Sequence, residues 1–70
     1  MLRAQAIATL KELATNGLID TAWVSLEERK PGVFQLKVKG NYDPSAMDPF
    51  LKKHSLQLEK NIQKGWLIIY

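Results

Sequence analysis

The strongest structural signal in the sequence is a β-hairpin over residues 21–40, in which two alternating runs flank a Lys30-Pro31-Gly32 turn. Polar and charged side chains occupy most of the positions between the apolar ones. The apolar residues are Ala22, Val24 and Leu26 in the first run, and Phe34, Leu36 and Val38 in the second. Strict alternation is typical of strands that bury one face. The stretch therefore predicts two antiparallel strands whose inner face is the floor of the core.

The turn must bring both apolar sets to the same face, because a shift of one residue would turn one set outward. A two-residue loop would pair Leu26 with Lys37, which has the wrong parity. A three-residue loop, 30–32, pairs Leu26 with Leu36 and places Gly32 in the left-handed position that closes such loops. A bulge near the turn is the alternative, because proline is unfavourable in the middle of that loop.

Residues 2–16 predict the first helix, because strong helix formers dominate this segment. Its apolar residues recur at spacings of three and four, which gives one apolar stripe. They are Ala6, Ile7, Leu10, Leu13 and Ala14. Gly17 follows the last turn, where a left-handed residue is favoured, and Leu18 then falls where it can contact Leu13.

Two aspartate–proline pairs, Asp43-Pro44 and Asp48-Pro49, each predict the start of a helix. The aspartate would be the N-cap and the proline the first helical residue. A proline deep inside a helix loses a backbone hydrogen bond. We therefore expect a single helical turn after Asp43 and the main second helix from Pro49.

The end of this second helix is ambiguous. One interpretation extends it over residues 49–64, with Gly65 as the terminator, and capping signals at both ends favour it. The alternative ends the helix near Ser55 and makes Leu56, Leu58 and Ile62 part of a strand that turns at 63–65. Residues 56–62 are therefore open to assignment as helix or strand.

The last segment, Trp66 to Tyr70, is apolar on both sides and predicts a strand covered on both faces or by a partner. The resulting α-β-β-α-β order predicts an α+β two-layer sandwich, with both helices on one face of a three-stranded sheet. A right-handed crossover would make the third strand parallel to the second. That connection favours the sheet order 2-1-3, with the first hairpin strand in the centre. The strand interpretation of 56–62 gives the alternative order α-β-β-α-β-β.

Composition restricts the classes of function. The chain has 70 residues, which we expect to form one small domain, 1–70. It contains no cysteine, which excludes disulfides and thiolate sites, and no residue spacing typical of a metal or cofactor site. His54 is the single histidine, has no nucleophile or second base at a useful spacing, and is expected at the edge of the core. These features predict a protein that is not an enzyme and has no cofactor, metal or evident small-molecule substrate.

The sequence also lacks signals for a membrane. The longest apolar run, 66–70, is too short to cross a bilayer. Charged residues lie in the first helix, and no leader pattern precedes it. We therefore expect a cytoplasmic protein with no membrane partner.

If the helices cover one face of the sheet, the other face carries large aromatic and basic side chains. The candidate interaction surface consists of Trp23, Lys37, Lys39, Trp66 and Tyr70. Exposed aromatic patches usually mark sites of association. We therefore predict a small protein-interaction or regulatory module, either a homodimer formed through the open sheet face or bound to another protein.

The alternative function is nucleic-acid binding. The formal net charge is +3 and the pI about 9.4, which is a mild basic excess. A tryptophan among basic residues on the outer face of the hairpin could stack on a base. The candidate contacts are Trp23, Arg29, Lys30, Lys37 and Lys39. The remaining basic residues are spread through the chain, so charge alone does not decide between the two functions.

Overall fold

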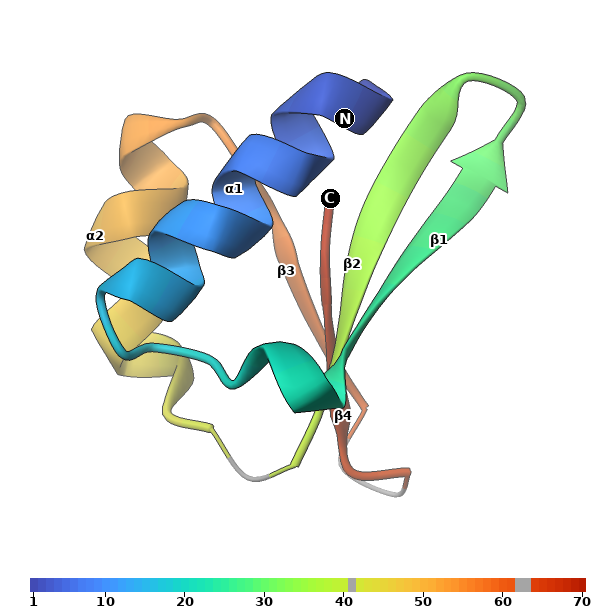
Figure 1. The fold of residues 1–70 in the computed structure, drawn as a ribbon. Helices are drawn as coiled ribbons and strands as arrows, with labels where there is room; N and C mark the ends of the chain where they lie inside the picture. Colours follow the sequence, from blue (N-terminus) through green and yellow to red (C-terminus); the bar gives the residue numbers. More distant parts are fainter. Residues whose placement is uncertain (41, 62–63) are drawn as a thin grey trace.

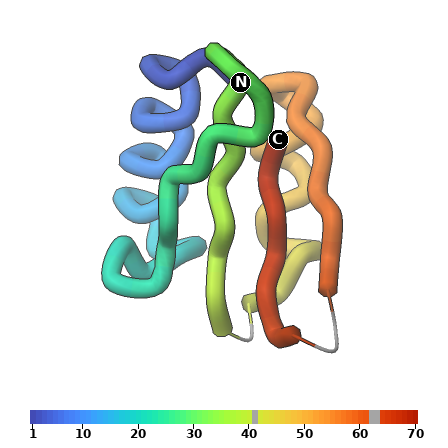
Figure 2. The backbone as a smooth tube through the Cα atoms, turned by 90° about the vertical axis from the view of Figure 1, so that its right-hand side faces the viewer, coloured from blue at the N-terminus to red at the C-terminus, as the bar shows by residue number. Residues whose placement is uncertain are grey.

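The computed structural model describes residues 1–40, 42–61 and 64–70. Its helices are α1 (Arg3–Thr15) and α2 (Pro44–Lys53), and a short 3-10 helix, Thr21–Trp23, precedes the sheet. The strands are β1 (Val24–Lys30), β2 (Val33–Lys39), β3 (Leu58–Asn61) and β4 (Trp66–Ile69). Both helices lie on one side of the sheet (Figure 1), and Figure 2 views the opposite, open side with the strands in front. The fold is an α+β two-layer sandwich, as predicted, but with the alternative element order α-β-β-α-β-β.

The predicted register of the hairpin is confirmed, since Val24 pairs with Val38 and Leu26 with Leu36. The turn itself follows the bulge alternative. Lys30 pairs with the residue just after Pro31-Gly32, and the register shifts between residues 28 and 30. A two-residue loop alone would give the wrong parity, and the extra residue at the bulge restores it.

The predicted strand number and order are wrong. The sheet has four antiparallel strands in the order β1-β2-β4-β3, so β1 is an edge strand and β2 lies inside the sheet. The segment predicted as the third strand, parallel to the second, is β4, and it runs antiparallel to β2. The strand that runs parallel to β2 is β3, with β4 between them. An edge position suits β1, because its second half, Glu27–Lys30, is entirely charged.

The core lies between the helices and the inner face of the sheet. Leu36 and Val38 of β2 are fully buried there, and the other inner residues of the hairpin pack against the same cluster. The inner hairpin residues of β1 and β2 therefore form the predicted floor of the core. Ala22, predicted on the same face, is instead exposed in the 3-10 helix. The buried apolar residues of this core are Ala6, Leu13, Ile19, Leu36, Val38, Met47, Leu51, Leu67 and Ile69.

Helix α1 ends as predicted. Gly17 has φ +70°, its N–H donates to Ala14, and the N–H of Leu18 donates to the carbonyl of Leu13. This pair of bonds is the Schellman motif, which satisfies carbonyls that the helix end would otherwise leave free. The stripe that faces the core is shifted slightly from the predicted one, since Thr9 is buried as well.

Helix α2 starts five residues earlier than predicted. Asp43 is its N-cap and accepts a hydrogen bond from Ser45 N–H, and the helix then continues through Pro49. Asp48, expected as a second N-cap, lies inside the helix and forms an ion pair with Lys52 at 3.0 Å. Pro49 and Ser45 are both exposed, so the carbonyl that Pro49 leaves without a helical donor can bond to water.

Helix α2 also ends earlier than predicted, at Lys53, and the long helix over 49–64 is wrong. Ser55 takes φ +56°, and its N–H donates to Lys52, while the N–H of Leu56 donates to Leu51. This is the same Schellman motif that ends α1, with serine in the position that usually holds glycine. The chain then enters β3, as in the strand alternative. Ile62 and Gln63, which both interpretations included, lie outside the described residues.

The beginning of the chain also pairs with the sheet. The amino group of Met1 donates to the carbonyl of Phe34, and the N–H of Phe34 donates to the carbonyl of Met1. Phe34 lies beyond the end of β4, so Met1 supplies the backbone partners that β4 does not reach. This pairing places the two ends of the chain near each other, as Figures 1 and 2 show.

Candidate functional site

The open face of the sheet is formed by the residues that alternate with the buried ones. On the two inner strands these are Lys37 and Lys39 of β2, opposite Ile68 and Trp66 of β4. Cross-strand partners project to the same face, so all four side chains lie on the side without helices. Four of the five residues predicted as an interaction surface, Lys37, Lys39, Trp66 and Tyr70, are therefore brought together along β2 and β4.

Trp66 carries two ammonium groups over its ring. Lys37 Nζ lies 3.4 Å from the ring centroid and Lys64 Nζ lies 5.1 Å from it. Lys39 is the cross-strand partner of Trp66, so a third lysine starts beside the same ring. The ring is half-buried, so part of its surface remains open to solvent. Contacts of this kind contribute about 0.5–1 kcal/mol at exposed sites.

In the described part of the chain, the lysines around Trp66 have no carboxylate partner. Among residues 1–40, 42–61 and 64–70, the ion pairs are Lys52–Asp48 and His54–Glu12, and neither lies at this site. Among the described residues, the open face carries five cations, Arg29, Lys30, Lys37, Lys39 and Lys64, and two carboxylates, Glu27 and Glu59. The formal charge of this face is therefore +3, the same as the net charge of the whole chain.

Tyr70 lies at the other end of the open face and is covered by Arg29. The guanidinium carbon of Arg29 lies 4.1 Å from the centroid of the Tyr70 ring. Arg29 Nη1 also donates to Gln35 Oε1 at 3.2 Å, and Gln35 Nε2 donates to Glu27 Oε1 at 3.2 Å. Arg29 is the extra residue of the β1 bulge, and a bulge redirects the side chain that it carries.

Among the described residues, Trp23 and Lys30 take part in none of the cation–π contacts with Trp66 and Tyr70. Trp23 belongs to the 3-10 helix before β1 and is 59% exposed, and no cation lies over its ring in the described part of the chain. Lys30 lies at the hairpin turn, where it pairs with Val33. Sequence reasoning missed Lys64 and Gln35. Alternation gives no signal for a lysine in a turn, but it does place Gln35 on the same face as Lys37.

A small cavity of about 150 Å³ adjoins Trp66 where the strands end. It extends the site around the edge of the sheet and brings a further cation, Lys60, to the same end of the molecule. Its lining residues are Gly40, Tyr42, Lys60, Asn61, Gly65, Trp66 and Leu67. The Tyr42 hydroxyl accepts a hydrogen bond from Asp20 N–H and so retains its own proton to donate.

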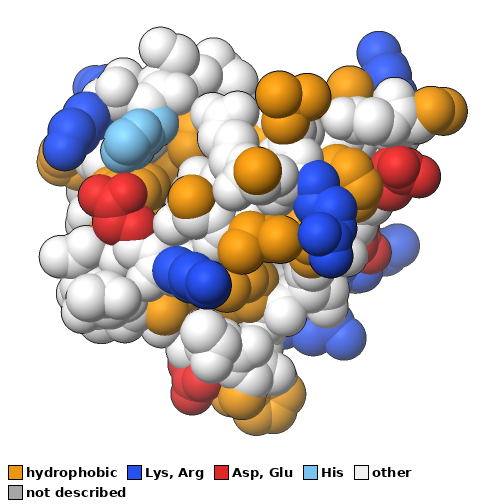
Figure 3. All heavy atoms as spheres, turned by 45° about the horizontal axis from the view of Figure 1, so that its top comes forward, with side chains coloured by type: hydrophobic (Ala, Val, Ile, Leu, Met, Phe, Trp, Pro, Cys, Tyr) orange, Lys and Arg blue, Asp and Glu red, His pale blue; other side chains and the backbone are white. Residues whose placement is uncertain are grey.

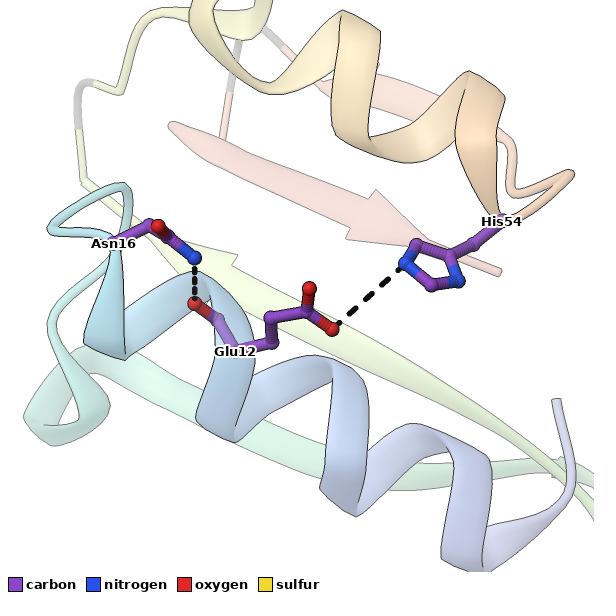
Figure 4. Close-up of polar contacts among 3 residues, drawn as sticks. All are labelled: Glu12, Asn16 and His54. Carbon is purple, nitrogen blue, oxygen red and sulfur yellow. Dashed lines mark hydrogen bonds and ion pairs between the residues drawn. The ribbon is translucent and has the colours of Figure 1, made fainter.

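The single histidine lies on the helical side of the molecule. His54 Nε2 is 3.8 Å from Glu12 Oε2, and its ring centroid lies 4.7 Å from that of Phe50 (Figure 4). In the space-filling view, the histidine lies at the surface beside an acidic side chain (Figure 3). Asn16 Nδ2 donates to the backbone carbonyl of Glu12, not to its carboxylate. The predicted place at the edge of the core is confirmed, and the pair links the end of α2 to α1.

No group of three His, Cys, Asp or Glu residues in the described ranges is arranged to hold a metal ion. Neither described helix has the length and apolar composition needed to cross a bilayer. Comparison with protein-family models, with curated proteins and with solved structures finds no match for this chain. Its function is therefore argued from the geometry of the open face.

Proposed function

We propose that this protein is a small, non-enzymatic binding module whose open sheet face binds nucleic acid. The observation that carries the proposal is the cluster of Lys37, Lys39 and Lys64 around Trp66 without a carboxylate partner in the described residues. Unpaired cations beside an aromatic ring are the combination that binds a phosphate backbone and a base together.

Stacking of a base on Trp66 would be more favourable than the contact that Lys37 now makes with the ring. The ammonium of Lys37 over Trp66 is worth about 0.5–1 kcal/mol. Stacking of a base on an aromatic ring is worth about 1–3 kcal/mol. A lysine side chain is flexible, so Lys37 can move its ammonium group to a phosphate while a base takes the face of the ring.

Charge reversal on the open face tests this proposal. We expect binding of a mixed-sequence oligonucleotide to weaken with salt at a slope of about −0.7 per phosphate contact, or about −2 for three lysines. The affinity would then fall about 20-fold between about 50 and about 200 mM salt. Replacing both Lys37 and Lys39 by glutamate should reduce the slope to about −0.7 and abolish most of the binding.

The matched control replaces Lys52 and Lys53 by glutamate. These lysines lie at the end of α2, on the other side of the sheet, and their reversal changes the net charge by the same amount. Fluorescence anisotropy of a labelled oligonucleotide measures both pairs. The proposal fails if the unmodified protein does not bind at low salt, or if the two double variants weaken binding equally.

The second candidate is self-association through the same face, which Trp23 favours because 59% of its surface is exposed. Such a homodimer would bury Trp23, Lys37, Lys39, Trp66 and Tyr70. It ranks second because two copies of a face with net positive charge repel each other. Light scattering at micromolar concentration separates the two candidates. A dimer that Trp66→Ala dissociates, together with no retention on nucleic acid, would favour self-association.

A further inference from the structure

We infer that the nucleic acid is single-stranded and that its bases occupy two subsites, one at Trp66 and one at Tyr70 with Gln35. This inference rests on the proposed function and defines the ligand of the same face. It depends on the spacing of the two rings and on the hydrogen-bonding groups of Gln35.

The two rings lie in one row on β4. Trp66 and Tyr70 are four residues apart on the same face, so their Cα atoms are separated by about 13 Å. Ile68 lies between them and is only 9% exposed, so neighbouring side chains cover most of it. Each ring is half-buried and contacted by cations, Trp66 by Lys37 and Lys64, and Tyr70 by Arg29.

A row of rings of this kind suits unpaired bases. In a duplex the bases are stacked on one another, and their faces are not available to a protein ring. In a single strand the bases can be splayed out and stacked on aromatic side chains. The cations beside Trp66 and Tyr70 then lie where the phosphates between the bases would pass.

Gln35 gives the Tyr70 subsite a means to distinguish bases. It lies one residue beyond the Leu36–Ile69 pair of β2 and β4, and so beside Tyr70. Its amide is oriented by two partners of opposite kind, because Arg29 can only donate and the Glu27 carboxylate can only accept. One N–H and one oxygen lone pair of the amide therefore remain for the edge of a base.

The Trp66 subsite has a different character. Its neighbours are the three lysines, whose charges attract phosphate but do not distinguish one base from another. We therefore expect Trp66 and its lysines to provide most of the affinity. Gln35 should provide the base preference.

The test compares a labelled oligonucleotide as a single strand and as a blunt duplex, at low salt, by fluorescence anisotropy. We expect the single strand to bind at least about tenfold more tightly. Trp66→Leu and Tyr70→Leu should each weaken single-strand binding by about 5- to 150-fold, the value of one stacked base. Phe50→Leu, on α2 and so on the helical side of the sheet, is the control and should leave binding unchanged.

Base preference is measured with four single strands that differ only in their repeated base. Gln35→Met keeps the size of the side chain but removes its amide, so it should retain binding and bring the four affinities closer together. Circular dichroism of each variant establishes that it is folded.

Equal affinity for single strand and duplex would overturn the inference while leaving the proposed function intact. An unchanged base ranking in Gln35→Met would overturn the Gln35 assignment. If the unmodified protein binds neither the single strand nor the duplex at low salt, the proposed function fails as well.

Discussion

Replacing Ser55 by glycine is expected to stabilise the protein. Ser55 has φ +56°, a left-handed backbone conformation that L-residues with a side chain adopt at a cost of about 1–2 kcal/mol. Glycine removes this cost. It also lowers the free energy of unfolding by about 0.4–1 kcal/mol, because the unfolded chain has greater conformational freedom with glycine. The net gain is about 0.5–1 kcal/mol, which corresponds to a rise in Tm of about 2–8 °C for a domain of this size.

Two controls separate backbone strain from a general effect of glycine. Gly17→Ser makes the reverse change in the equivalent motif of α1, where φ is +70° and a Cβ would meet no atom within 4 Å. It should lower stability by a similar amount. Ser45→Gly changes the same residue type in the first turn of α2, where φ is not left-handed, and should also be destabilising.

Thermal and urea unfolding, followed by circular dichroism, measure all three variants. The urea m-value should stay constant, because none of the changes alters the surface exposed on unfolding. A Ser55→Gly variant that is no more stable than the original protein would refute the reasoning. It would show that the hydrogen bonds of Ser55 and Leu56, at 3.1 Å and 2.8 Å, do not hold the turn in a strained conformation.

Two further changes test the core and the link between the helices. Leu36→Ala removes a fully buried side chain from β2 and should lower the free energy of unfolding, measured in urea, by about 2–5 kcal/mol. The control Leu2→Ala, at a residue that is 70% exposed, should change it by less than about 0.5 kcal/mol. Similar losses in both would contradict the assigned core. His54→Phe should be neutral or stabilising, because His54 Nε2 is shielded from solvent and has no hydrogen-bond partner among the described residues, and because the ring already packs on Phe50. A loss above about 1 kcal/mol on unfolding at neutral pH would instead assign a stabilising role to the contact with Glu12.

Much of the candidate site follows from alternation along the strands. Period two places Lys37 and Lys39 together on one face, and the same rule applied to the last strand places Trp66 and Tyr70 on one face. Alternation does not reveal which cation covers which ring. Arg29 reaches Tyr70 from a bulge on β1, two strands away from β4, and nothing local to Arg29 specifies that contact.

Of the two helix ends, the sequence likewise predicts one and not the other. Both helices end in a Schellman motif, but the sequence predicts only the one at Gly17, because glycine is the residue that adopts the left-handed position without strain. At Ser55 the packing of Leu51 and Leu56 in the core accompanies the same conformation in a serine. The prediction of a helix over 49–64 therefore followed a real signal, Gly65, that in the structure belongs to the turn before β4.

The sequence by itself determined the features that depend on neighbours a few residues apart. These are the hairpin and its register, the first helix with its end at Gly17, and the two faces of the strands. Each is settled by local backbone preference and by the need to bury one face. Tertiary structure alone decided the order of the strands, the strand character of Leu58–Asn61, and the contacts of Trp66 and Tyr70 with cations. These features depend on the relative free energies of alternative pairings between distant segments. A local sequence pattern does not predict which of those pairings has the lowest free energy.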